Sequence, residues 1–559
     1  MIRIQPVKPI DKRNMFNWWQ CPSPQAINRL ATARLALFSH QVGSRELLLS
    51  NTKASLGGKV PHYATVPISL SDVKLQRQSR PTNLFLALFL AVAVTMEPLS
   101  RGHELTQWFG RNGGYLSQAI EMRHSLEDGY HYVARKRPIG PKESVCRCPF
   151  GLTLSHLNVM PVSPPGIRNY SVGSACSKLV GNPEIERHTV SIFFLAEQRM
   201  RGEDSFWSPY IRVLPLENEM ATPLWFNDEE MAYLKGTNLF SNSTPREETS
   251  IGLQEGHFRA QWHLGVAELK RAGEPADNFT WELFLWAATV FSSRGFTSDL
   301  ITTTKEPKGS FPILYPVLDV FNHHTGAKVR WQFCEGDYDL YLEEKVDQGQ
   351  QIFNNYSPKG NEDLLMGFGF CIPDNPYDQV AVRLGQVQPN VYGKLHESIP
   401  SHWQSKTWEP EESIFYLQAT SRHSFGRLNV YGDSELSCLR RIPFDLAKSV
   451  QIILLERNKL SGLILGEQQA WAGAINVLLH QMEHALMGIT RWDRELPDSP
   501  CTSGAKAAWI YRAGQVKILQ EVISDLKTFA GNDKTEASGE RKVPSIVASS
   551  LLIAILRLA

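Results

Sequence analysis

The middle of the chain alternates between apolar and polar residues in a pattern that is typical of β-strands. Apolar side chains recur at every second position of residues 329–333 and again of residues 338–342. Gly336 lies between the two runs and suits a tight turn, so the pattern predicts a half-buried β-hairpin. A second turn at Gly349 would return the chain toward Tyr356, at the end of another extended segment.

Apolar residues at helical spacing predict helices on both sides of this hairpin. Two lie before it, over residues 192–199 and 281–294. Three amphipathic helices follow it, over residues 444–460, 467–487 and 505–529. A shorter helix is expected just after the hairpin region, with Asn361 as its capping residue. The pattern predicts an α+β protein with a β-rich core and an all-helical C-terminal region.

The two ends of the chain differ from the rest in composition. Residues 1–95 contain twelve Lys or Arg against three acidic residues and show no sustained periodicity. This stretch is expected to be a disordered extension or the product of a start codon assigned too early, before Met96, with a mitochondrial transit segment as the alternative. Residues 533–559 are expected to be a polar linker and a short apolar tail, for which a weak membrane anchor is the alternative.

The overall composition is ordinary for a globular protein. The chain has 559 residues, 42% of them hydrophobic and 21% charged, which allows two or three domains. Its net charge of +1 gives no general attraction to nucleic acid, so no direct nucleic-acid partner is expected. The eight cysteines include one close pair, Cys146 and Cys148, with no second pair at zinc-binding spacing. We therefore expect no metal site, and reduced thiols in a cytoplasmic or nuclear protein.

Two motifs flank the predicted hairpin and carry the strongest functional signal. The first, residues 318–324, reads Leu-Asp-Val-Phe-Asn-His-His, and the second, residues 354–370, ends in Met-Gly-Phe-Gly-Phe. Together they resemble the paired signatures of the SET-domain protein methyltransferases, in particular the branch that includes the Rubisco large-subunit methyltransferase. The matching residues are Asp319, Asn322, His323, Tyr356, Pro358, Lys359, Asn361, Leu364, Leu365, Gly369 and Phe370.

This resemblance implies roles for residues in both motifs and upstream of them. Tyr356 is expected to be the catalytic residue. The cofactor is expected to be S-adenosylmethionine, bound by Asp128, Gly129, Tyr130, Asn322, His323 and Phe370. The residues expected to face the substrate are Arg294, Asp319 and Phe368. For Arg294 a charge at a helix C-terminus is the alternative, and for Asp319 a structural hydrogen bond.

The chain also departs from the family pattern. His131 stands where relatives have the second glycine of a cofactor-binding turn, which removes glycine's conformational freedom at that point. Ser298 stands where the plant enzyme has a second arginine. Phe368 replaces a tyrosine, so the number of methyl groups transferred stays open. The aromatic segment 205–210, Ser-Phe-Trp-Ser-Pro-Tyr, resembles a marker of this branch and is expected to serve packing.

The domain organisation that the resemblance implies has two parts. A SET domain is expected over residues 96–377, with a β-core that contains a pseudoknot and with a helical insert at about 178–300. A helical substrate-binding domain is expected over residues 378–532, before the linker and tail at 533–559.

The function that the resemblance implies is S-adenosylmethionine-dependent methylation of a lysine in a non-histone protein, such as a ribosomal protein or another cytosolic protein. Methylation of a protein histidine is one alternative, because one animal relative performs it on actin. A catalytically inactive SET-like binding module is the other. The expected partner is a protein that bears a target lysine. We expect no membrane association, and we expect a monomer.

If residues 1–95 lie outside the fold, a chain that starts at Met96 should melt at the same temperature as the full chain and bind cofactor equally well. Scanning calorimetry and titration calorimetry measure the two quantities. A melting temperature lower by many degrees would show instead that the extension packs against the core.

Overall fold

The computed structural model describes the chain from residue 98 onward, with gaps. The described residues are 98–240, 245–298, 310–334, 336–384, 414–419, 441–460, 466–497, 499–536 and 556–558. The predicted basic extension over residues 1–95 therefore lies outside the described residues, as does most of the predicted tail. Among the helices that the structure describes, none combines the length and the apolar character that a membrane span requires.

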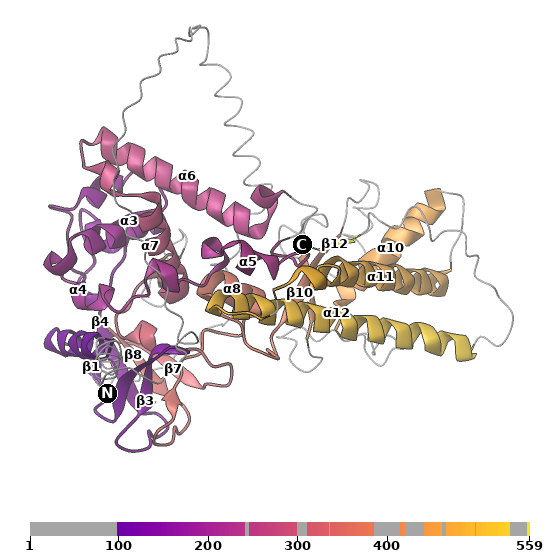
Figure 1. Cartoon of the computed structure of the whole chain (residues 1–559), viewed down its shortest axis with the longest axis horizontal. Coiled ribbons are helices and arrows are strands. Elements are labelled where there is room, and N and C mark those ends of the chain that lie inside the picture. The colour runs from indigo at the N-terminus through magenta and orange to yellow at the C-terminus, as the bar shows by residue number, and fades with distance from the viewer. Residues whose placement is uncertain are drawn as a thin grey trace, which may run out of the picture. The chain divides into compact units, whose positions relative to one another are not determined.

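Antiparallel sheets form the β-core (Figure 1). One sheet has the order β1-β4-β8-β7 and consists of β1 Tyr115–Leu116, β4 Ser144–Pro149, β8 Asp337–Leu342 and β7 Val329–Cys334. Strands β7 and β8 form the predicted hairpin, in which Val329 pairs with Leu342. Gly336 occupies the turn with φ +86°, a conformation that favours glycine.

A second sheet leads to the segment that contains Tyr356. It has the order β2-β3-β9 and consists of β2 Ile120–Ser125, β3 Gly129–Ala134 and β9 Gln351–Ile352. The predicted turn at Gly349, where φ is +86°, leads into β9. A shorter sheet pairs β5 Phe296–Thr297 with β6 Pro312–Ile313. The pairing of Tyr132 with Ile352 thus places an early hairpin beside the second motif.

Helices fill the interval between β4 and β5. They are α3 Arg187–Met200, α4 Ser208–Ile211, α5 Asp228–Ala232, α6 Ser250–Arg271 and α7 Trp281–Arg294. Both helices predicted here, over residues 192–199 and 281–294, are confirmed. Thr249 and Thr280 cap α6 and α7 by accepting hydrogen bonds from backbone N–H groups.

Short 3-10 helices occupy many of the connections. They are η3 Phe150–Leu152, η4 His156–Val159, η5 Ala175–Leu179, η6 Gly202–Asp204, η7 Glu217–Glu219, η8 Pro223–Trp225, η9 Arg246–Glu248, η10 Ala276–Asn278, η12 Leu318–Val320 and η14 Asp493–Glu495. Among these, η12 forms the first turn of the first sequence motif, so that motif begins in a tight helical turn rather than in a strand.

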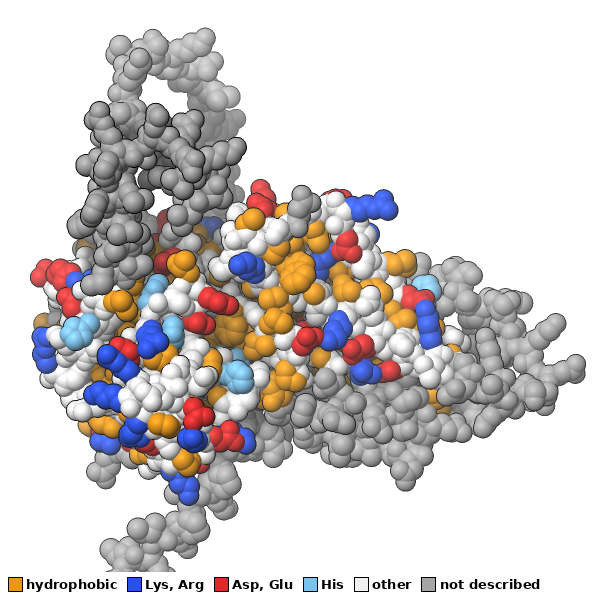
Figure 2. All heavy atoms as spheres, turned by 60° about the horizontal axis from the view of Figure 1, so that its bottom comes forward, with side chains coloured by type: hydrophobic (Ala, Val, Ile, Leu, Met, Phe, Trp, Pro, Cys, Tyr) orange, Lys and Arg blue, Asp and Glu red, His pale blue; other side chains and the backbone are white. Residues whose placement is uncertain are grey.

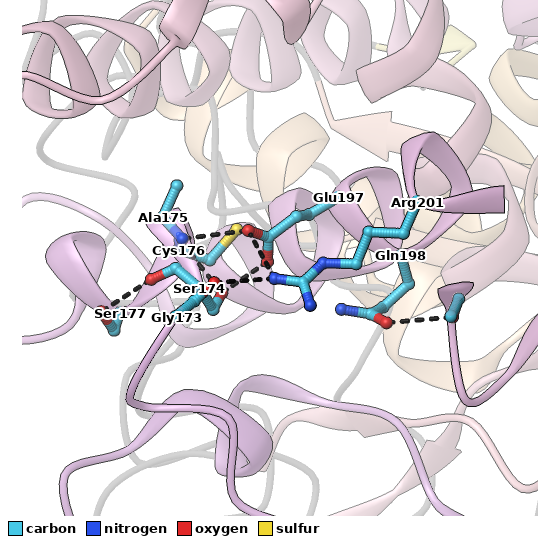
Figure 3. A network of polar contacts seen from close by, with 9 residues as sticks. Gly173, Ser174, Ala175, Cys176, Ser177, Glu197, Gln198 and Arg201 are labelled. Carbon is cyan, nitrogen blue, oxygen red and sulfur yellow. Dashed lines mark hydrogen bonds and ion pairs between the residues drawn. The ribbon is translucent and has the colours of Figure 1, made fainter. Parts of the chain in front are cut away.

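A carboxylate on α3 anchors the loop that precedes this helix (Figure 3). Glu197 accepts hydrogen bonds from the Ser174 hydroxyl and from the Ala175 backbone N–H. Arg201, the residue that follows α3, lies 3.4 Å from the same carboxylate and donates to the Gly173 carbonyl at 2.8 Å. Because the Glu197 carboxylate is hydrogen-bonded and paired with Arg201, these contacts offset the free-energy cost of burying its charge.

The short helix of the second motif begins differently from the sequence prediction. Helix α8 spans Asn361–Phe368, and no side chain caps it at Gly360. The prediction that Asn361 caps the helix is therefore wrong. The Asn361 backbone N–H donates instead to the carboxylate of Asp378, at 2.9 Å. At the other end Gly369, with φ +78°, closes the helix.

Three long helices dominate the C-terminal region, as predicted. They are α10 Phe444–Leu460, α11 Glu467–Thr490 and α12 Ser503–Glu536. The region is not all helical, which corrects that part of the prediction. Strands β10 Gln379–Leu384 and β11 Ile414–Gln418 pair antiparallel, and β12 Leu556–Leu558 pairs with the other edge of β10. Helix α12 extends into the predicted linker, and β12 lies in the predicted tail.

Helix α12 packs against α8 through polar and close backbone contacts. The Tyr511 hydroxyl donates to Glu362 on α8 at 2.7 Å. Gly514 approaches Asp378 so closely that a Cβ there would lie 2.3 Å from a carboxylate oxygen. The buried Arg512 donates to the carbonyls of Lys235 and Ile489 at 2.8 and 2.6 Å. The Tyr511 contact connects the second motif with α12, Gly514 packs on the Asp378 side chain that holds the start of α8, and Arg512 connects α12 with Lys235 and with α11.

The Glu362 carboxyl should make the free energy of unfolding depend on pH near neutrality. Burial raises its pKa from 4.5 to about 7. The folded state then keeps a proton that the unfolded state loses, so the stabilising contribution is full below about pH 4.5 and is lost as the pH rises to about 7. Glu362→Gln, which cannot ionise, should be more stable than the wild type at about pH 8, by on the order of 2 kcal/mol.

Urea unfolding at about pH 5 and about pH 8 measures this difference. Asp374→Asn serves as the control, because Lys517 lowers the pKa of the exposed Asp374 carboxyl. Removal of this carboxyl should give no gain in the free energy of unfolding at either pH. An equal gain in the free energy of unfolding for Glu362→Gln at both pH values would contradict the prediction. The gain would then come from packing and not from the loss of a charge.

Candidate active site

The two sequence motifs lie side by side in the structure. His323 and Asn354 form an isolated parallel β-bridge. The Asn354 backbone N–H donates to the Asn322 carbonyl at 2.7 Å, and the His324 backbone N–H donates to the Asn354 carbonyl at 3.0 Å. The hairpin β7–β8 lies between the motifs in sequence and returns the chain from one to the other.

Four aromatic side chains gather where the motifs meet. The Tyr356 ring stacks on His323, with centroids 5.1 Å apart, and on Phe368, with centroids 5.0 Å apart. The centroid of the Phe370 ring lies 6.2 Å from those of both His323 and Phe368. We call His323, Tyr356, Phe368 and Phe370 the aromatic cluster. It brings together residues that the sequence assigned to catalysis, to cofactor binding and to substrate binding.

His323 is neutral and presents one unpartnered nitrogen. Burial lowers its pKa from 6.5 to about 4. Its Nδ1 accepts a hydrogen bond from the Tyr356 backbone N–H at 3.0 Å, so the proton of the neutral ring lies on Nε2. This Nε2 is buried and has no hydrogen-bond partner among the residues that the structure describes. A buried donor without a partner is the kind of atom that a bound ligand satisfies.

The Tyr356 hydroxyl is held in its protonated form. Burial raises its pKa from 10 to about 12, although the Arg294 guanidinium opposes this shift. The hydroxyl donates to the Phe321 carbonyl at 3.0 Å. Its proton is therefore engaged, and the oxygen lone pairs remain available to accept a hydrogen bond.

The two charged residues predicted to face the substrate form an ion pair. Arg294 ends α7, and its Nη1 lies 3.4 Å from the Asp319 carboxylate and 3.2 Å from the Asp319 carbonyl oxygen. The hydroxyl of Tyr210, on α4, donates to the same carboxylate at 2.7 Å. The Asp319 side chain is fully buried, whereas that of Arg294 is 24% exposed. Asp319 thus makes the structural hydrogen bond that was the alternative, and its contact with a target side chain stays a prediction.

The turn before β3 lies next to the first motif. The Asn322 side-chain amide donates to the Asp128 carbonyl at 3.0 Å. Gly129 follows with φ +60°, a left-handed conformation that glycine adopts without strain. The Tyr130 ring packs on His124, with centroids 4.7 Å apart. Of the three residues before β4 that are predicted to bind cofactor, Asp128 contacts Asn322 directly, and Gly129 and Tyr130 follow it in the chain.

His131 shows that the missing glycine leaves the backbone undisturbed. The residue lies within β3 and pairs with Arg123 in the β-ladder. Its φ is not among the positive values, so the position does not require glycine's freedom. Its Nδ1 lies 3.0 Å from the Gly129 carbonyl oxygen, which holds the imidazole against the turn.

Three further residues belong to the site although the sequence assigned them no role. Tyr210 holds Asp319, as described. Lys359 is buried, with Nζ 5.9 Å from the centroid of the Phe368 ring, and burial lowers its pKa. Gly369 lies so near the insert that a Cβ would be 2.8 Å from the Ala221 carbonyl carbon. The sequence could have suggested Lys359 and Gly369, because both match the second motif. Tyr210 lies in the aromatic segment 205–210, which was expected to serve packing.

The described residues include no group of three or more His, Cys, Asp or Glu side chains placed to hold a metal ion.

Comparison with known proteins gives relatives from fungi and animals. No family model matches the chain. It is 29% identical to "Ribosomal lysine N-methyltransferase set10" of Schizosaccharomyces pombe, over 76% of this chain and 72% of that protein. It is 29% identical to "Ribosomal lysine N-methyltransferase 1" of Saccharomyces cerevisiae, over 36% of this chain and 38% of that protein. It is 27% identical to the actin-histidine N-methyltransferase of Drosophila melanogaster, over 51% of this chain and 52% of that protein.

Solved structures with a similar fold are SET domains. One is the SET domain of LSMT bound to methyllysine and AdoHcy, with a TM-score of 0.55 and 17% identity over 79% of this chain and 97% of that chain. Rubisco LSMT bound to AdoMet gives the same values. The fold is therefore that of a SET domain. The chain is thus similar in sequence to protein-lysine methyltransferases and similar in fold to the SET domain of Rubisco LSMT, as the two sequence motifs predicted.

Asn322→Ala should weaken binding of S-adenosylmethionine by on the order of 1–3 kcal/mol, because the change removes a polar group beside the turn that is predicted to bind cofactor. Titration calorimetry measures the affinity. His324→Ala, at an exposed position in the same segment, is the matched control and should bind like the wild type. An unchanged affinity in folded Asn322→Ala would place the cofactor elsewhere.

Proposed function

We propose that this chain is an S-adenosylmethionine-dependent protein-lysine N-methyltransferase, and that its target is a lysine of a ribosomal protein or of another non-histone cytosolic protein. The observation that carries the proposal is the Tyr356 hydroxyl, which is protonated, bound to the Phe321 carbonyl and set among the aromatic cluster. The names of the two yeast relatives support a lysine of a ribosomal protein as the target.

The residues around the first motif fit the cofactor. S-adenosylmethionine supplies a methyl group on a sulfonium when it is bound. The unpartnered Nε2 of His323 offers a donor, and the Asn322 amide and Asp128 carbonyl lie next to it in sequence or in space. Phe370, beside His323, offers an aromatic face for the adenine. The roles of Asp128, Gly129 and Tyr130 belong to the same proposal.

Methyl transfer to a lysine requires the amine to be neutral. A free lysine side chain has a pKa of about 10.4, so the site must favour loss of the proton. Burial of the amine against Tyr356, Phe368 and the neutral His323 would remove it from water, and this desolvation disfavours its charged form. Arg294 is paired with Asp319, so the like-charge repulsion that opposes an ammonium would come from the sulfonium of the bound cofactor. The amine therefore enters a site that favours its neutral form.

The attacking amine must also be oriented. The Tyr356 hydroxyl donates a hydrogen bond to the Phe321 carbonyl, so its oxygen can accept a hydrogen bond from an N–H of the amine. That hydrogen bond directs the nitrogen lone pair away from Tyr356. Alignment of this kind, in place of a random encounter, is the main source of rate in a reaction that needs little acid–base chemistry. Phe368 is not a phenol, so it offers no second hydroxyl to hold a water or an amine proton.

A histidine target is the second candidate, because the Drosophila relative is named as an actin-histidine N-methyltransferase. A catalytically inactive binding module is a third possibility, which titration calorimetry with S-adenosylmethionine would test, since an inert scaffold should not bind. Mass spectrometry of the methylated protein distinguishes lysine from histidine. The experiment is transfer of radiolabelled methyl groups into a lysate from cells that lack this protein, followed by identification of the labelled residue.

We further propose that the protein acts in the cytoplasm or the nucleus, as a monomer, without a nucleic-acid partner. The cysteines Cys146, Cys148, Cys176, Cys371 and Cys501 are free thiols, which suits a reducing compartment. Acidic and basic side chains are interspersed on the face in Figure 2, so that face has no broad patch of one sign. Sedimentation of the purified chain and fluorescence imaging of the tagged protein test these proposals.

Tyr356→Phe should lower kcat by about a hundredfold or more, which corresponds to roughly 2.7 kcal/mol of barrier. The ring remains, so the stacking on His323 and Phe368 should persist and the affinity for cofactor should change little. The hydrogen bond between the Tyr356 hydroxyl and the amine forms only after the substrate is bound. Its removal should therefore lower kcat.

Methylation rates at saturating cofactor, with melting temperature as the control for folding, measure the effect. Tyr338→Phe removes another buried hydroxyl, one without a hydrogen-bond partner among the described residues, and should leave the rate unchanged. A near wild-type rate in folded Tyr356→Phe would make Tyr356 a core aromatic and contradict its catalytic role.

A further inference from the structure

Tyr210 is a buried phenol that joins the helical insert to the first sequence motif. It lies on α4, more than a hundred residues before the motif, and its side chain is fully enclosed. Its hydroxyl donates to Asp319 Oδ2 at 2.7 Å, across a sequence separation of 109 residues. A buried hydrogen bond to a carboxylate is stronger than one between neutral groups, so the contact restrains both partners.

Asp319 connects this contact to Arg294. Arg294 Nη1 lies 3.4 Å from Asp319 Oδ2, and the same nitrogen donates to the Asp319 carbonyl at 3.2 Å. Asp319 Oδ1 has no partner within the described part of the chain. The carboxylate is thus held on one oxygen only, by Tyr210 and Arg294, and loss of the phenol would leave it with a single long contact.

The backbone beside Asp319 is strained. Val317 has φ +75° and ψ −41°, a conformation that is rare for a β-branched residue. Strain of this kind persists only where the surroundings hold the segment in place. The turn η12 follows at once, and it ends next to Phe321, whose carbonyl accepts the Tyr356 hydroxyl at 3.0 Å. The position of that carbonyl therefore depends on what restrains residues 317–321.

The same ion pair sets the charge near Tyr356. The Arg294 guanidinium and the Asp319 carboxylate act on the Tyr356 hydroxyl in opposite directions, the first lowering its pKa and the second raising it. A shift of Asp319 away from Arg294 would change both the field at the hydroxyl and the position of its acceptor. The hydrogen bond from Tyr210 to Asp319 opposes such a shift.

We propose that Tyr210 is a positioning residue for methyl transfer: its hydrogen bond to Asp319 holds the strained segment 317–321 and the Arg294 pair, and so holds the Tyr356 hydroxyl in the orientation that the amine needs. This inference rests on the proposed function of Tyr356. It assigns chemistry to an aromatic residue in a segment that the sequence attributes to packing alone.

Tyr210→Phe tests the proposal, because it removes the hydroxyl and keeps the ring. We expect kcat to fall by about fivefold to twentyfold, with KM for S-adenosylmethionine unchanged. Tyr338→Phe is the matched control, since it removes a buried hydroxyl to which the described part of the chain offers no hydrogen-bond partner, and it should leave kcat unchanged. Rates are taken per cofactor-binding protein and well below the melting temperature of the weaker variant. A purely structural role would lower the melting temperature and leave kcat of the folded protein at the wild-type value, which would overturn the proposal.

A double-mutant cycle identifies the residue through which Tyr210 acts. Once Tyr356→Phe has removed the catalytic hydroxyl, Tyr210→Phe should reduce kcat by less than about twofold further. Full additivity of the two losses would overturn the proposal, because it would mean that Tyr210 does not act through Tyr356.

Hydrogen exchange gives a readout that does not depend on activity. Tyr210→Phe should speed amide exchange in residues 318–321, and Tyr338→Phe should not. Unchanged exchange there would overturn the positioning role even if the rate had fallen. Absence of methylation by the wild type would contradict the proposed function, whereas wild-type turnover in Tyr210→Phe would contradict this inference alone.

Discussion

The hydrogen bond from the Tyr356 backbone N–H to His323 Nδ1 is the contact on which the site depends. It joins the two motifs at 3.0 Å and places the Tyr356 ring on the imidazole. Because it occupies Nδ1, it also fixes the tautomer and leaves the Nε2 proton for a ligand. One backbone contact therefore determines the position of a proposed catalytic side chain and the hydrogen-bonding character of a proposed cofactor-binding one. The low pKa of His323 keeps this arrangement in a single protonation state near neutral pH.

Carboxyl groups that accept a hydrogen bond from a hydroxyl recur where distant segments meet. Asp319 accepts from Tyr210 and ties the insert to the first motif. Glu362 accepts from Tyr511 and ties the second motif to α12. Glu197 accepts from Ser174 and holds the loop before α3. A buried carboxylate is stable only when such donors are present, so each of these pairs favours one packing of its segments over others.

The sequence predicted the regular elements better than the contacts between them. The β7–β8 hairpin and the long helices have clear periodicity and lie where they were predicted, although α12 runs seven residues beyond its predicted end. Strands β10 and β11 were missed because they lie in a region that helical patterns dominate. The cap of α8 was wrong because the carboxylate of Asp378, distant in sequence, replaces a local cap. The aromatic cluster gathers residues that the two motifs suggested, but their roles stay predictions. Tyr210 was not predictable, since its partner is not recognisable without the fold.

The spacing of these contacts along the chain has a consequence for how the protein is made. Tyr210 and Asp319 are 109 residues apart, Tyr511 and Glu362 are 149 apart, and the Asn322 amide reaches the Asp128 carbonyl across 194 residues. Contacts between distant residues form slowly, because the entropy of closing the intervening loop is lost before the contact repays it. A chain emerging from the ribosome would therefore have β2, β3 and the whole insert exposed before their partners in the two motifs were synthesised. We expect this protein to rely on chaperones during synthesis more than its many local helices would suggest.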